Sequence, residues 1–232
     1  MQLQAEGFEC GVIGGCAVGA YGRLQGESVL SGDLDLYSSA ETLNALLLWA
    51  PQHGLIVRKR PQPRSIPTAF IEWEGLEVNV LTRTDGLPPP EQALQTAREF
   101  RLKSQPDVAI LVIDPFDLLR NKLAVNRPKD RPHIAILRRF IEEEVVAGFE
   151  NGSSPRDRIA PARRFLSVLD ARALPAELAA RLIPLAKTPA EFRFLVDTVP
   201  SRDDVEAVLE RTPEETREEL REILKRRRFR KS

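Results

Sequence analysis

The 232-residue chain is poor in the residue types that form the commonest cross-links and metal sites. It contains two cysteines, Cys10 and Cys16, and two histidines, His53 and His133. A disulfide framework or a zinc site needs several such residues at close spacing, so the sequence predicts neither. Carboxylates are therefore the metal ligands that the sequence offers.

Long apolar runs and a net charge are lacking too. The longest runs, such as residues 108–113, are far too short to cross a bilayer, and no basic N-terminal region precedes an apolar one. Basic and acidic side chains balance at 34 each, and 42% of the residues are hydrophobic. These values predict a cytoplasmic protein with an ordinary hydrophobic core and no membrane association.

The most informative stretch that is present spans residues 11–37. A short apolar strand ends at Gly14 and Gly15, where the backbone can adopt positive φ and approach a ligand. Amide groups at the start of the following helix can then hold a phosphate. Asp33 and Asp35, two apart on the next strand, share one face and can bind one or two hard cations. A phosphate cradle beside a carboxylate pair predicts phosphoryl or nucleotidyl transfer.

The pattern of the first 150 residues predicts an α/β (α+β) domain with a mixed sheet and flanking helices. We expect helices at residues 41–51, 91–101, 114–123 and 132–149, and strands at 11–13, 54–58, 68–73, 76–82 and 108–113. Glu74 and Gly75 predict a tight hairpin turn. After it, Glu77 and Asn79 lie on the polar face of an otherwise apolar strand.

A composition change at residues 150–155 predicts a boundary between domains at 1–150 and 151–232. The second domain is predicted to be entirely helical. It ends in a strongly basic segment at residues 225–231, for which two interpretations are open. The segment either contacts nucleic acid phosphates or forms a solvated helix end that interacts favourably with the helix dipole.

The glycine pair and the Asp-x-Asp strand resemble the signature of the DNA polymerase β-like nucleotidyltransferase superfamily. Residues 113–137 are similar to the stretch that follows the sheet in its AbiEii-type toxin or minimal nucleotidyltransferase branch. This resemblance implies that Lys122 reaches the nucleotide phosphates and that Arg127 and Asp130 line or support the same cleft. The helical pattern alone gives an alternative for Lys122, whose stem would follow the apolar stripe and carry the ammonium to water.

Two positions depart from the superfamily pattern. The usual Arg-x-Thr before Asp-x-Asp is reduced to a single hydroxyl, that of Ser31. The usual third carboxylate, which completes the metal site and helps to activate the acceptor, is replaced by Asn79. Glu77, roughly 7 Å earlier on the same strand face, either substitutes for it or is a solvated residue, and the sequence favours neither interpretation.

The resemblance implies a metal-dependent transferase that moves an NMP from an NTP to an acceptor hydroxyl on RNA or tRNA, a protein or a small molecule. Asp33 and Asp35 would hold Mg²⁺ or Mn²⁺, and Gly14, Gly15 and Lys122 would bind the triphosphate, with Ser31 beside it. A toxin–antitoxin component with an antitoxin protein as partner is a further hypothesis. The alternative is a non-catalytic nucleotide- or RNA-binding protein on a degenerate nucleotidyltransferase fold.

Overall fold

The computed structural model describes residues 3, 6–62, 65–102 and 105–226. The chain divides into two compact units, Met1–Phe140 and Ile141–Ser232, and the dividing point lies inside helix α5 (Arg131–Asn151). The predicted domain boundary at residue 150 lies near the end of the same helix.

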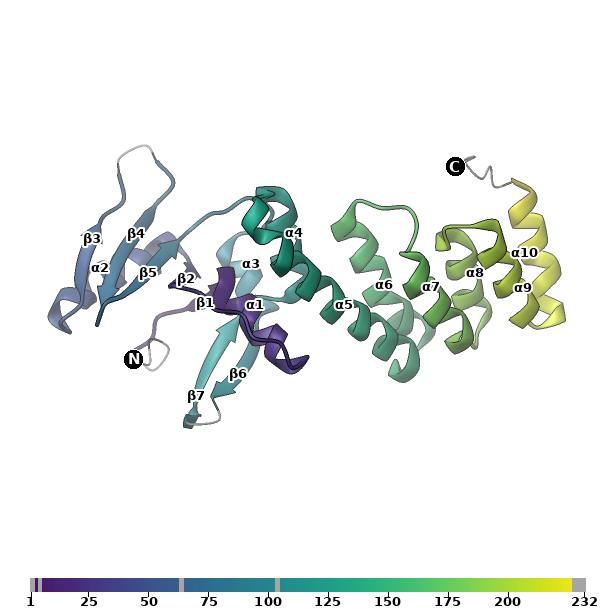
Figure 1. Cartoon of the computed structure of the whole chain (residues 1–232), viewed down its shortest axis with the longest axis horizontal. Helices are drawn as coiled ribbons and strands as arrows, with labels where there is room; N and C mark the ends of the chain where they lie inside the picture. Colours follow the sequence, from purple (N-terminus) through teal and green to yellow (C-terminus); the bar gives the residue numbers. More distant parts are fainter. Residues whose placement is uncertain (1–2, 4–5, 63–64, 103–104, 227–232) are drawn as a thin grey trace. The chain divides into compact units, whose positions relative to one another are not determined.

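A seven-stranded mixed sheet forms the centre of the first unit and confirms the predicted α/β class (Figure 1). The strand order is β3-β4-β5-β2-β1-β7-β6. β2 pairs in parallel with β5, and β1 in parallel with β7, whereas the other neighbours are antiparallel. The strands are β1 (Cys10–Ile13), β2 (Asp33–Ser38), β3 (Ile56–Lys59), β4 (Thr68–Trp73), β5 (Leu76–Leu81), β6 (Arg98–Leu102) and β7 (Gln105–Val112).

Helix α2 (Ala40–Gln52) covers one face of the sheet. It begins at Ser39, whose hydroxyl accepts a hydrogen bond from the amide of Thr42 at 3.1 Å. Apolar residues at alternate strand positions pack against it, as the period of two predicts. This core includes Leu36, Leu43, Leu46, Leu47, Ala69, Ile71, Val78 and Val80. Asp33 and Asp35 on β2, and Glu77 and Asn79 on β5, therefore face the opposite side.

Helices α1 (Gly14–Leu24) and α4 (Pro115–Val125) help to build that opposite side. The hydroxyl of Tyr21 on α1 donates a hydrogen bond to the carbonyl oxygen of Ile113, just after β7, at 2.9 Å. The Tyr21 ring also contacts the rings of Phe100 and Phe140, with centroids 5.3 and 4.8 Å apart. These buried contacts hold α1 against the chain entering α4.

The helix predicted at residues 91–101 is wrong in its second half. Helix α3 (Pro90–Gln95) ends early, and β6 follows, pairing antiparallel with β7. Phe100, which falls in the range predicted as a helix, lies on β6 and packs edge-on against Tyr21. Pairing with the neighbouring strand β7 outweighs the local helical pattern.

All regular elements described between residues 152 and 226 are helical, as predicted (Figure 1). They are α6 (Pro155–Leu169), α7 (Ala176–Leu182), η2 (Ile183–Leu185), α8 (Pro189–Thr198), α9 (Arg202–Arg211) and α10 (Glu214–Arg226). The buried Arg158 ties this unit together by donating to the carbonyl oxygens of Phe149 and Leu185 at 2.5 and 2.8 Å. Most of the basic C-terminal segment, from residue 227 on, lies outside the described residues. No helix in the described ranges has both the length and the hydropathy to cross a membrane.

Candidate active site

The turn from β1 into α1 lies directly against Asp35. Gly14 has a φ of +69°, and a Cβ added to it would lie 2.0 Å from the Asp35 Oδ2 atom and 3.0 Å from its Cβ. Antiparallel pairing of β1 with β2 sets this contact, because Ile13 is in register with Asp35. Glycine is thus required both for the backbone conformation and for the close approach.

A second glycine contact places Ser31 beside the same turn. A Cβ on Gly15 would lie 2.6 Å from the Ser31 Oγ atom, and that hydroxyl donates to the Asp33 Oδ1 atom at 2.9 Å. The thiol of Cys16 donates to the backbone carbonyl of Asp33 at 3.2 Å. Burial raises the pKa of this thiol. The glycine turn and the start of β2 therefore form one continuous structure.

Strand β5 brings Glu77 and Asn79 to the same face as the two aspartates. Parallel pairing sets Asp33 in register with Glu77, and Asp35 with Asn79. The Asn79 Nδ2 atom donates to the Asp35 Oδ1 atom at 3.0 Å, whereas its Oδ1 atom is buried without a hydrogen-bond partner. Glu77 is solvent-exposed. Asn79, and not Glu77, is thus the β5 side chain that contacts the carboxylate pair.

The two aspartates share an electrostatic environment. Burial is the main cause that raises the pKa of Asp35, and the negative charge of Asp33 raises it further. The hydrogen bond from Asn79 and the charges of Lys122 and Arg127 act in the opposite direction. A bound cation would relieve the same repulsion between the carboxylates.

The cations come from α4 and the turn that follows it. Asp114 caps α4 by accepting from the amide of Phe116, and Asn126 ends the helix in the left-handed conformation, with a φ of +50°. Arg127 and the short helix η1 (Pro128–Asp130) then bring Asp130 back against Lys122.

Lys122 and Asp130 form a buried ion pair. Their side chains are 3% and 1% exposed, and the Nζ–Oδ1 distance is 3.0 Å. Arg127 donates through Nε to the other carboxylate oxygen at 2.7 Å. Burial alone would raise the pKa of Asp130, but the hydrogen bonds from Arg127 and Lys122 lower it overall. The interpretation of Lys122 as a side chain that extends to water is therefore wrong.

Arg127 lies close enough to the carboxylate pair for their charges to influence it. Its hydrogen bond to Asp130 is the largest cause that raises its pKa, and the charges of Asp35 and Asp33 add to the effect. The structure thus brings together most of the residues that the sequence indicated. Glu77 lies beside them but is exposed.

His133 also lies beside these residues, although the sequence did not indicate it. Its Nδ1 atom lies 3.5 Å from the Asp130 Oδ1 atom, and a Cβ on Gly15 would lie 3.7 Å from its Cε1 atom. Burial, followed by the charge of Lys122, lowers the pKa of the imidazole. The available signal was its spacing, since residue i+3 from Asp130 on a helix faces the same side.

The carboxylates of Asp33 and Asp35 are the candidate metal ligands of this site. Within the described ranges, no three His, Cys, Asp or Glu side chains gather closely enough to hold a metal. Asp33 and Asp35 nevertheless fit Mg²⁺ or Mn²⁺, because Mg²⁺ is usually bound through one or two carboxylates and otherwise keeps water and substrate phosphates. The Asn79 Oδ1 atom is a further hard oxygen without a partner.

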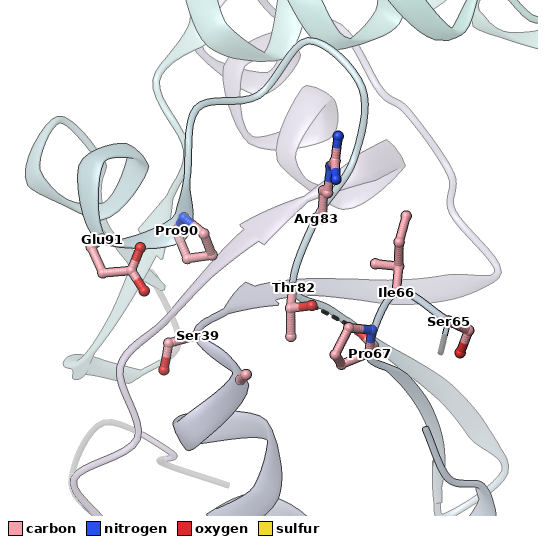
Figure 2. A pocket seen from close by; sticks show the side chains of 9 residues that line it. Ser39, Ser65, Ile66, Pro67, Thr82, Arg83, Pro90 and Glu91 are labelled. Carbon is pink, nitrogen blue, oxygen red and sulfur yellow. Dashed lines mark hydrogen bonds between the residues drawn. The ribbon is translucent and has the colours of Figure 1, made fainter. Parts of the chain in front are cut away.

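A separate cavity of about 500 Å³ lies beyond the other end of β2. Figure 2 shows its lining, in which Thr82 donates to the carbonyl oxygen of Pro67 at 2.9 Å. Ser39 and Arg83 lie in this lining, after the carboxyl ends of β2 and β5 respectively. Asp33 and Asp35 stand at the start of β2, so this cavity is not the space in front of the carboxylates.

Comparison with known proteins gives low similarity. No family model matches the chain, and no curated protein matches it in sequence. The crystal structure of ANT(2″)-Ia in complex with adenylyl-2″-tobramycin is 14% identical and aligns over 71% of this chain and 92% of its own, with a TM-score of 0.45. A tRNA nucleotidyltransferase complexed with a primer tRNA and an incoming ATP analogue is also 14% identical and aligns over 95% of this chain and 82% of its own, with a TM-score of 0.28.

Both TM-scores are low, so these similarities carry no argument about function. Membership of the AbiEii-type branch, and with it the antitoxin partner, stays a prediction.

Proposed function

We propose that this chain is a nucleotidyltransferase that moves an NMP from an NTP to an acceptor hydroxyl. One observation carries the proposal: Gly14 lies so close to Asp35 that no side chain could separate them. A backbone turn suited to phosphate thereby adjoins a carboxylate pair suited to a hard cation. Positioning and charge neutralisation are what phosphoryl-group transfer requires of a protein.

Each group has a role in this proposal. Asp33 and Asp35 would hold the divalent metal, which supplies charge neutralisation and orients the phosphates when bound. The amides at Gly14 and Gly15 bind the triphosphate, and the Ser31 hydroxyl keeps Asp33 oriented. Asn79 holds Asp35 in place across the β2–β5 pair.

The cation group would act on the phosphates of the nucleotide. Lys122 and Arg127 lie close enough to influence the pKa of Asp35, so their charges also reach a ligand bound at the carboxylates. Asp130 fixes both cations by accepting hydrogen bonds from them. Charges that are fixed in advance stabilise developing charge without reorganisation during the reaction.

A second candidate is a non-catalytic nucleotide- or RNA-binding protein. The observation that favours it is the amide of Asn79, which contacts Asp35 where the superfamily resemblance implies a third carboxylate. A site that lacks this group could bind a nucleotide without activating an acceptor.

Label transfer separates the two candidates. The purified protein is incubated with each NTP labelled at the α-phosphate, Mg²⁺, and one of three acceptor classes: total RNA, protein, or small hydroxyl compounds. The proposal predicts transfer by the wild type to one class and none by Asp33→Asn. Stabilisation without transfer would favour the binding protein, since a nucleotide at about 100 times its Kd adds about 2.7 kcal/mol to the unfolding free energy. No thermal shift with any NTP would contradict the transferase and the nucleotide-binding form of the second candidate.

A further inference from the structure

We propose that His133 is a phosphate-binding residue of this site, donating from Nε2 to the nucleotide triphosphate held at the Gly14–Gly15 turn. This inference rests on the proposed function and adds a group to it. It assigns a role to His133, one of the chain's two histidines, for which the sequence resemblance implied none.

The His133 imidazole lies near Asp130 on one side and near the Gly14–Gly15 turn on the other. Its Nδ1 atom is 3.5 Å from the Asp130 Oδ1 atom, and its Cε1 atom faces the position that a Gly15 side chain would occupy. Cε1 lies between the two ring nitrogens, Nδ1 and Nε2. The edge of the imidazole that carries the nitrogens is therefore the edge that faces the glycine turn. The side chain is 20% exposed, which leaves it within reach of a ligand.

Among the residues that the structure describes, none forms a hydrogen bond with either ring nitrogen of His133. Nδ1 is buried without a hydrogen-bond partner, although Asp130 is close enough to pair with it. Asp130 already accepts from Lys122 and Arg127 at shorter distances. The arrangement favours the tautomer whose Nδ1 proton faces Asp130, because a carboxylate only accepts. Nε2 is then left to face a ligand.

The charged groups around His133 explain why binding of an anion would change the protonation of its imidazole. Lys122 from α4 and Arg127 from the following turn oppose its protonation, and Asp130 from η1 favours it. The Asp33 carboxylate accepts a hydrogen bond from the neutral Ser31 hydroxyl, which also lies beside Gly15. Burial and Lys122 lower the pKa of the imidazole, so it is largely neutral in the free protein near pH 7. A triphosphate brought to the turn reverses this balance and draws a proton onto the ring.

Proton uptake on binding distinguishes this role from a structural one. Binding of Mg²⁺-ATP is measured by calorimetry at pH 7.5 in two buffers of different ionisation enthalpy. The variants are His133→Gln, which keeps a donor but cannot titrate, and His53→Gln as the matched control. His53 is exposed and bonds to the Trp49 carbonyl oxygen outside the site.

We expect the wild type and His53→Gln to take up a proton on binding, and His133→Gln to lose most of this uptake and bind about tenfold more weakly. His133→Asn, which keeps a polar atom near Asp130, should do the same if the Gln variant folds poorly. Wild-type uptake and affinity in both His133 variants would overturn the role of His133 while leaving the proposed function intact. Failure of the wild type to bind any NTP would overturn both.

Discussion

Asn79 donates a hydrogen bond to Asp35 across the parallel β2–β5 pair, with 3.0 Å between Nδ2 and Oδ1. The contact is made by a neutral amide at a buried position that is only 8% exposed. It gives Asp35 a partner but adds no charge for a metal ion. We therefore expect substitutions at Asn79 and Asp35 to change both the stability of the fold and its dependence on a metal ion.

Replacing Asn79 by Asp should make folding depend on metal. A second carboxylate beside Asp35 loses the hydrogen bond and adds like-charge repulsion, which should cost about 2 kcal/mol without metal. Millimolar Mg²⁺ should restore most of this loss. Urea denaturation with EDTA and with Mg²⁺ measures both values.

Glu77→Gln is the matched control, because Glu77 is exposed and lies two residues away on the same strand face. It should change stability by less than about 0.5 kcal/mol in either condition. It should also leave label transfer within about twofold. A large loss of transfer would instead make Glu77 the missing third carboxylate, and the role given to Asn79 would fail.

Asp35→Asn should stabilise the metal-free protein at neutral pH. Burial and Asp33 raise the pKa of Asp35, so its ionised form is less favourable in the folded state than in the unfolded chain. This cost is present above the folded pKa and disappears as pH falls towards the unfolded value of about 4. The gain in Tm over the wild type should shrink over the same range. A gain that does not change with pH would exclude this cause.

Gly14→Ala and Gly26→Ala separate backbone strain from the close approach to Asp35. Both glycines have positive φ, +69° and +77°, but a Cβ on Gly26 would meet nothing within 4 Å. Gly26→Ala should cost about 1 kcal/mol from conformation alone. Gly14→Ala should cost about 2 kcal/mol more and abolish nucleotide binding, because the Asp35 side chain must move. Equal effects in both variants would remove the steric argument.

Lys122→Met should destabilise the fold as well as weaken nucleotide binding. It leaves the buried Asp130 with Arg127 as its cationic partner, and breaking a buried ion pair costs about 3 kcal/mol. The double variant Lys122→Met with Asp130→Asn should lose less than the sum of the two single variants. Additive losses would show that the pair is not coupled.

Much of the sheet was predictable because its signals are local. The period of two in residues 76–81 assigned Val78 to the core face and Asn79 to the opposite face, and the structure confirms both. The glycine pair follows β1 directly, at the start of α1, and the Asp-x-Asp segment lies on β2, which pairs with β1. The helix predicted at residues 91–101 was wrong after Gln95, because the strand β6 that follows depends on pairing with β7, which the local sequence does not encode.

The charged part of the site was only partly predictable. The resemblance placed Lys122, Arg127 and Asp130 in one cleft, but the burial of Lys122 depends on the turn that carries Asp130 back to it. His133 was missed because its proximity to Gly15 joins residues more than a hundred positions apart.

The central claim is tested most directly by following where the α-phosphate and the γ-phosphate of the NTP go during the reaction. The protein is incubated with Mg²⁺, the responsive acceptor and one NTP labelled either at the α- or at the γ-phosphate. The account predicts that the α-label enters the acceptor, that the γ-label leaves in pyrophosphate, and that Asp33→Asn and Asp35→Asn each abolish both. Entry of the γ-label into the acceptor, or undiminished transfer by either variant, would contradict it.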